Sequence, residues 1–316
     1  MTGWNCAKVW RAVQLGGVGV AAVWASAWWH AGRPGVALAG CVWLLGGPAW
    51  ALLLQGLWAA ALSGADGPRA AVRWRAGAAE LVWNLRVFGW QQPWRSAACP
   101  DTVAPTPRRG VLLVHGHLCN RAFWLPWLRW LQARGVPYAT VSLWPMGADI
   151  DHHAPAIEAA LQRLIALTGQ PPLVLAHSKG GLSVRAWWRW CLQAGADEAA
   201  VTARVHGVIT LASPHQGTLL AQAGVGAAAR QLAPGGAWLQ ALAAGEPAAW
   251  RARLLCVASD ADAVVYPPAL AGLPGAMQHT LPGLAHIELA FDPAVQSLVW
   301  RALAAPAARS TDKGPW

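Results

Sequence analysis

The chain has 316 residues, of which 55% are hydrophobic, and it carries a formal net charge of +10. That apolar content excludes an intrinsically disordered protein, and the six cysteines form no CxxC pair that would indicate a disulfide framework or a zinc site. The positive charge is spread along the chain without a nucleic-acid-binding motif. We therefore expect attraction to anionic lipid headgroups and no nucleic-acid partner.

The first 65 residues contain two apolar runs of membrane length. Residues 12–29 carry no charge, and in residues 36–62 Gln55 is the only strongly polar side chain. As helices, both runs can cross the roughly 30 Å of bilayer hydrocarbon. Because the five-residue link 31–35 between them contains glycine and proline, the sequence predicts a two-helix transmembrane hairpin over residues 1–65.

Basic residues flank both ends of the predicted hairpin, whereas its turn holds only Arg33. By the positive-inside rule, both ends and the domain that follows are expected on the cytoplasmic side. A signal peptide cleaved at residues 25–27 is the alternative, but it leaves the second apolar run unexplained. The flanking residues are Lys8, Arg11, Arg69, Arg73 and Arg75.

Residues 66–106 join the hairpin to the rest of the chain. From Glu80 to Trp94 the apolar side chains indicate an amphipathic segment, which would lie on the membrane surface or cover an edge of the next domain. A proline-containing stretch then leads into the first predicted strand. We expect one globular domain over residues 107–304 and a flexible tail at 305–316.

The most informative stretch of the sequence is residues 172–181, and two loops with notable side chains precede it. The apolar run 111–114 predicts a buried strand that ends in His115-Gly116-His117. Farther along, a loop carries four side chains of metal-binding types. It opens a helix, where acidic residues satisfy free N–H groups, and no second cluster lies at metal-site spacing, so we expect no metal. The four are Asp149, Asp151, His152 and His153.

The stretch from Pro172 to Gly181 predicts a strand that ends in a sharp strand-to-helix turn. Such a turn pushes the Ser178 hydroxyl out of the sheet toward a base, which a weak oxygen nucleophile needs. Small residues at positions 176 and 180 suit this turn, although alanine stands at 176 where glycine is usual. The backbone N–H groups of His117 and Lys179 would then stabilise an oxyanion.

The alanine- and glycine-rich residues 218–250 contain an apolar helix candidate at 238–242. An insertion at this place would cap the site and move when a substrate or a lipid interface binds. A static helical insertion is the alternative.

A further predicted strand at 254–258 precedes two aspartates, Asp260 and Asp262, and His286 lies in a loop before an apolar, helix-like run. This gives the order serine, acid, histidine that an α/β-hydrolase requires. Either aspartate can orient the imidazole through its Nδ1 proton, so the residues alone leave the acid open.

From Pro107 to about Trp300, the chain resembles the bacterial lipase-like esterases of the α/β-hydrolase superfamily. In that family the acid stands in an Asp-x-x-Val turn closed by proline, which residues 262–267 match, so the resemblance favours Asp262 over Asp260. Lys179 stands where an apolar or amide residue is more usual, and a cation there would favour an anionic ester. The blocks that carry the likeness are residues 114–116, 147–151, 176–187 and 212–218.

The resemblance implies an α/β-hydrolase fold, with helices on both faces of a mostly parallel sheet, and acyl transfer through Ser178, His286 and Asp262. We expect a membrane-anchored carboxylic ester hydrolase in the bacterial inner membrane, acting on apolar or lipid-like esters without a cofactor. Two alternatives stay open. They are an acyltransferase with the same triad and a catalytically silent, membrane-tethered interaction module.

Overall fold

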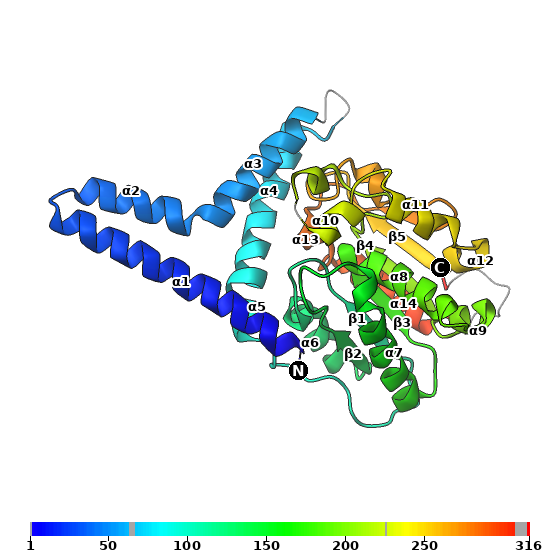
Figure 1. Ribbon diagram of the computed structural model, residues 1–316. Coiled ribbons are helices and arrows are strands. Elements are labelled where there is room, and N and C mark those ends of the chain that lie inside the picture. Colours follow the sequence, from blue (N-terminus) through cyan, green and yellow to red (C-terminus); the bar gives the residue numbers. More distant parts are fainter. Residues whose placement is uncertain (1, 63–66, 225, 307–314) are drawn as a thin grey trace.

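The computed structural model of the chain describes residues 2–62, 67–224, 226–306 and 315–316. Its centre is a six-stranded parallel sheet in the order β2-β1-β3-β4-β5-β6 (Figure 1). The strands predicted near residues 111, 173 and 254 are all present, and the predicted parallel α/β architecture is confirmed. The strands are β1 (Val111–Val114), β2 (Tyr138–Val141), β3 (Leu173–His177), β4 (Gly207–Leu211), β5 (Leu254–Ala258) and β6 (Met277–Thr280).

Helices cover both faces of the sheet, as strands that are apolar on both sides require. Along β1, Val111 and Leu113 face a core shared with α6 and α14, whereas Leu112 and Val114 face one shared with α7 and α8. This alternation follows from the two-residue period of side chains along a strand. The four helices are α6 (Leu125–Ala133), α7 (Ala154–Thr168), α8 (Lys179–Gln193) and α14 (Pro293–Ala304).

The insertion predicted at residues 218–250 folds as short helices against α8. Leu239 and Leu242 of α11 pack on α8. Glu246 forms a two-point ion pair with Arg185 of α8 through contacts of 2.7 Å, and neither side chain is exposed. These contacts tie the insertion to the α/β domain. Its elements are η5 (Leu219–Ala223), α10 (Ala227–Gln231), α11 (Ala237–Ala244) and α12 (Ala248–Arg251).

Five short elements complete the domain between these larger ones. They include two that carry residues of the site, η4 and α13. The elements are the 3₁₀ turns η3 (Arg121–Trp124), η4 (Asp151–His153) and η6 (Pro268–Ala271) and the helices α9 (Glu198–Ala203) and α13 (His286–Leu289).

The N-terminal residues form a helical arm that projects from the α/β domain (Figure 1). The helices α1 and α2 pack against each other as a hairpin, and α3 lies beside α4 close to the domain. The arm thus returns to the domain instead of standing apart from it. Its helices are α1 (Thr2–His30), α2 (Pro34–Leu45), α3 (Gly47–Leu62) and α4 (Ala70–Asn84).

The predicted transmembrane hairpin is not present as two straight spanning helices. In the part of the chain that the structure describes, no single helix has both the length and the apolarity of a membrane span. Pro34–Leu45 and Ala49–Leu62 reach that length and composition together, as a pair bent by 63°. The bend falls at Gly46-Gly47-Pro48, where glycine weakens a helix and proline lacks an N–H group. The run predicted as one helix over residues 36–62 is therefore two helices.

The amphipathic stretch from Glu80 to Trp94 continues α4 through a π-helix, η2 (Leu85–Gln91), and the short helix α5 (Gln92–Trp94). Val87 is buried in the core that contains α6, and the ring of Trp83 stacks on Phe291 with centroids 4.5 Å apart. Of the two placements that the sequence allows, the structure has the one in which this segment covers an edge of the domain.

Candidate active site

Ser178 stands at the turn between β3 and α8. β3 ends at His177, α8 begins at Lys179, and Ser178 between them has φ 53° and ψ −129°. A positive φ is strained for a residue with a side chain, and such strain concentrates at functional sites. Glycine is needed at position 180, because a β-carbon there would lie 2.5 Å from the carbonyl oxygen of Val114. The predicted strand-to-helix turn is therefore present.

Asp262 and His286 meet from two segments that follow β5 and β6. His286 Nδ1 donates to Asp262 Oδ2 at 2.8 Å, and both residues are buried. The other carboxylate oxygen, Oδ1, accepts the N–H groups of Val264 at 2.7 Å and Val265 at 3.0 Å. This arrangement fixes the tautomer of the imidazole, so that Nε2 is the nitrogen free to take a proton.

The second candidate acid is directed elsewhere. Asp260 Oδ1 accepts the backbone N–H of Gly283 at 2.6 Å. Of the two aspartates, Asp262 is the one that contacts the imidazole of His286.

The pKa of His286 is set by opposing influences. Burial by itself lowers it, but the charge of Asp262, the hydrogen bond to that carboxylate and the charge of Glu80 together raise the pKa above its ordinary value. A raised pKa makes the imidazole a stronger base toward a hydroxyl proton.

In the described part of the chain, Ser178 shares no hydrogen bond with His286. The two segments are instead joined through the residue before the serine. His177 Nε2 donates to the carbonyl oxygen of His286 at 3.1 Å, and the two rings lie 4.6 Å apart. Burial lowers the pKa of His177 well below its usual range, so this histidine is neutral and structural. Catalytic hydrogen bonds to a serine often tighten only when substrate is bound.

The two backbone groups predicted to bind an oxyanion come from segments that flank Ser178. The Lys179 N–H lies in the first turn of α8, where no intrahelical acceptor exists. His117 lies in the turn after β1, next to Leu118 with φ 57°. This turn touches the serine, since a β-carbon on Gly116 would lie 2.9 Å from Ser178 Cβ.

The Lys179 side chain is buried, with 1% of the residue exposed. Its Nζ lies 3.5 Å from His153 Nε2 of η4, and burial lowers the pKa of Lys179 to about 8. The amine is thus enclosed against a histidine. The predicted preference for anionic esters required this cation to face the substrate, and stays a prediction.

Three of the four side chains of metal-binding types, those of Asp149, Asp151 and His153, contact polar groups of the protein. Asp151 pairs with Arg189 at 2.6 Å, and Asp149 accepts the N–H of His152 at 2.8 Å. Among the residues that the structure describes, no group of three or more potential ligands could hold a metal ion.

Glu80, on α4, lies behind His286 and was not predicted as a site residue. Its Oε2 accepts the N–H of Ile287 at 2.9 Å, and its Oε1 accepts from Asn84 Nδ2 at 3.2 Å. Burial raises the pKa of Glu80 to about 7. The only sequence signal was a charged residue that opens an amphipathic stretch, and no motif connects it to a histidine about two hundred residues later.

A second contact of α4 lies on the same short helix. Arg75 forms a two-point ion pair with Glu288 at 2.8 and 2.9 Å, and Glu288 also accepts the N–H of Ala285. The arm thus holds the start of α13, where His286 stands.

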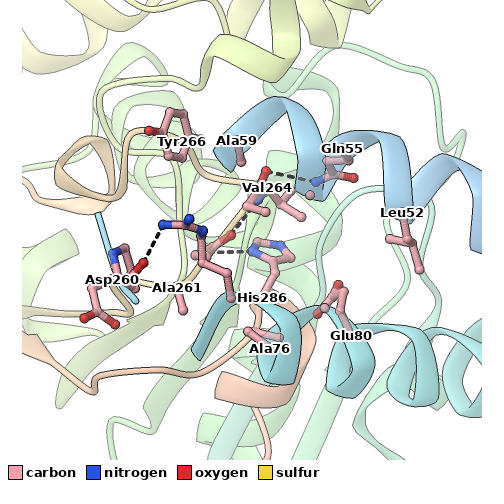
Figure 2. Close-up of a pocket in the computed structure, with 17 residues that line it drawn as sticks. Leu52, Gln55, Ala59, Ala76, Glu80, Asp260, Ala261, Val264, Tyr266 and His286 are labelled. Atoms are coloured by element: carbon pink, nitrogen blue, oxygen red, sulfur yellow. Dashed lines mark hydrogen bonds and ion pairs between the residues drawn. The ribbon is translucent and has the colours of Figure 1, made fainter. Parts of the chain in front are cut away.

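A cavity of about 70 Å³ lies where the arm meets the acid loop (Figure 2). Gln55 of α3 reaches it and donates to the carbonyl oxygen of Ala263 at 3.0 Å, while Glu80 of α4 lies on the side of His286 (Figure 2). Asp262 and His286 form its inner wall. One side of the candidate site is therefore built by helices that precede the α/β domain.

No protein-family model and no curated protein matches the chain. Solved structures do match. The mature form of Bacillus licheniformis lipase BlEst2 is 17% identical with a TM-score of 0.51, over 63% of this chain and 95% of that one. Aspergillus fumigatus lipase B is 16% identical with a TM-score of 0.53, over 65% of this chain and 55% of that one.

The chain has the fold of these lipases. At such low identity the likeness shows the α/β-hydrolase fold alone, and one fold supports many reactions. Function must therefore be argued from the site.

Proposed function

We propose that this chain is a carboxylic ester hydrolase in which Ser178 is the nucleophile, His286 the general base and Asp262 the residue that orients the base. The observation that carries the proposal is the 2.8 Å hydrogen bond from His286 Nδ1 to a buried aspartate, in a fold where Ser178 occupies a strained turn after β3. That combination supplies the nucleophile, the general base and the orienting acid that a serine hydrolase needs.

In the proposed reaction, Ser178 Oγ attacks the ester carbonyl while His286 Nε2 takes the hydroxyl proton. The backbone N–H groups of His117 and Lys179 stabilise the oxyanion of the tetrahedral intermediate. As the intermediate collapses, the carbon–oxygen bond to the alcohol breaks and His286 returns its proton to the leaving oxygen. Water, deprotonated by His286, then attacks the acyl-enzyme. The bond to Ser178 Oγ breaks as His286 returns this proton to Oγ, which releases the carboxylic acid and restores the serine.

The arm favours a lipid-like ester and attachment to a membrane. Most of the large hydrophobic side chains that the structure leaves exposed lie on α1, α2 and α3, which is far more apolar surface than a soluble monomer usually shows. We propose that this surface enters the bilayer. With basic residues at both ends of the hairpin, the α/β domain would lie on the cytoplasmic side of a bacterial inner membrane.

The proposal is tested with detergent-solubilised full-length protein, p-nitrophenyl esters and a fluorophosphonate probe. Labelling and turnover are expected in the wild type and lost in Ser178→Ala. The matched control is Ser183→Ala, because Ser183 is a buried serine on α8, the helix that follows Ser178, and its hydroxyl donates to the carbonyl oxygen of Lys179. A folded wild-type protein that neither labels nor turns over would refute the hydrolase and favour an interaction module. Preferential transfer of the acyl group to an added alcohol would identify an acyltransferase.

A further inference from the structure

Two helices of the arm, α3 and α4, enclose a second hollow that continues from the cavity beside His286. It is a groove of about 440 Å³ between α3 and α4, a size within the usual range of ligand sites. Four residues line both hollows, so the groove and the cavity adjoin one another. They are Leu52, Gly56, Arg73 and Gly77. We call the larger hollow the α3–α4 groove.

The lining changes in character from the groove to the cavity. In the groove the lining residues are apolar apart from Arg73, and they include Leu53, Leu57 and Trp74. The lining of the cavity adds polar and titratable side chains, among them Glu80 and His286. This difference between the two linings suits a molecule with a long hydrocarbon chain and one polar, reactive end.

Two glycines keep the groove open. Gly56 and Gly77 lie within α3 and α4, where glycine destabilises a helix relative to alanine. Neither is needed for close packing, because a β-carbon at either position would meet no atom within 4 Å. Neither has a positive φ that would require glycine. The room they leave is free for a ligand.

The outer end of the groove lies in the apolar surface of the arm. Leu53, Leu57 and Trp74 line the groove and are also exposed. A hydrocarbon chain could therefore pass from a bilayer into the groove without crossing water, which avoids the cost of hydrating it.

We propose that the α3–α4 groove binds the acyl chain of the ester substrate, so that the N-terminal arm, and not the α/β domain alone, selects chain length. The inference rests on the proposed ester hydrolase function. Ser178 lines neither hollow. In this proposal the acyl chain runs from the ester carbonyl at Ser178 past the ring of His286 and into the groove.

The test compares hydrolysis of p-nitrophenyl butyrate and p-nitrophenyl palmitate by Gly56→Leu and Gly77→Leu. Each substitution fills the groove from one of its two helices. We expect kcat/KM for the palmitate ester to fall by about tenfold or more, which is the size of effect that blocked hydrocarbon contacts produce. Butyrate turnover should fall less than palmitate turnover, so that the ratio of palmitate to butyrate kcat/KM drops, and fluorophosphonate labelling shows that each variant is folded.

Gly17→Leu on α1 is the matched control. Gly17 is also a helical glycine of the arm with no atom within 4 Å of an added β-carbon, and it lines neither hollow. It should leave both activities unchanged. If both groove variants keep the wild-type ratio of palmitate to butyrate turnover, the groove proposal is overturned while the hydrolase stands. If the wild type neither labels nor hydrolyses either ester, the proposed function fails, and the groove proposal fails with it.

Discussion

Replacing Glu80 with glutamine should stabilise the protein at alkaline pH. Glu80 is 9% exposed as a residue, and burial raises the pKa of its carboxyl group to about 7 from an ordinary value of 4.5. Between these two values the folded state binds more protons at this site than the unfolded state does. The free energy of unfolding therefore falls as pH rises through that window.

The size of this loss follows from the shift. A difference of about 2.5 in pKa, at 1.36 kcal/mol for each unit, corresponds to a loss of about 3 kcal/mol in unfolding free energy, which is complete above pH 7 and zero below pH 4.5. Glutamine does not ionise, and its amide oxygen can still accept the N–H of Ile287 that Glu80 accepts at 2.9 Å. Glu80→Gln should therefore lose no unfolding free energy at this site as pH rises, and its side chain should keep the hydrogen bond with Ile287.

The assay is urea unfolding of wild type and Glu80→Gln at several pH values from 4.5 to 8. The difference in unfolding free energy between them should grow in favour of the variant by up to about 3 kcal/mol, because the titrating groups that Glu80 does not influence cancel. Glu198→Gln, at an exposed glutamate of α9, should show no such trend. Parallel stability curves for wild type and Glu80→Gln would refute the reasoning.

The same substitution has a kinetic consequence. The charge of Glu80 is one of the influences that raise the pKa of His286, after the charge and hydrogen bond of Asp262. Removing it lowers that pKa, so the acid limb of the kcat/KM profile for a soluble ester should move to lower pH. An unmoved limb would mean that Glu80 does not act on the base.

Three further predictions concern the site and its support. Asp262→Asn should reduce kcat for p-nitrophenyl butyrate by roughly 10³-fold or more, whereas Asp260→Asn should change it only a few-fold; similar losses in both would contradict the assignment of the acid. Glu246→Gln should destabilise the protein by about 3–5 kcal/mol in urea unfolding, because it leaves Arg185 buried and unpaired, and an unchanged midpoint would disprove that account. Lys179→Met should keep fluorophosphonate labelling, since the proposed role of residue 179 uses only its backbone, and loss of labelling in a folded variant would show that the amine takes part.

Local sequence was a good guide to the α/β domain. The strand before Ser178 and the small residues around it act over a few positions, so their pattern predicts the turn that the structure shows. The arm was less predictable. Both runs had the composition of membrane spans, but Gly46-Gly47 lies inside the second run and the structure bends there by 63°. A pattern of apolar residues describes how much surface must be covered, and says little about the direction of the chain.

By itself, the sequence determined the strands near residues 111, 173 and 254, the strand-to-helix turn at Ser178 and the order of serine, acid and histidine, because each depends on neighbouring residues. Two aspartates two positions apart satisfied the same local pattern, and the hydrogen bond of Asp262 to His286 is a matter of where two loops meet. Only the tertiary structure placed Glu80 behind His286 and opened a groove between α3 and α4. Those features join segments about two hundred residues apart, or depend on the distance between two helices, and neither leaves a periodic or local trace in the chain.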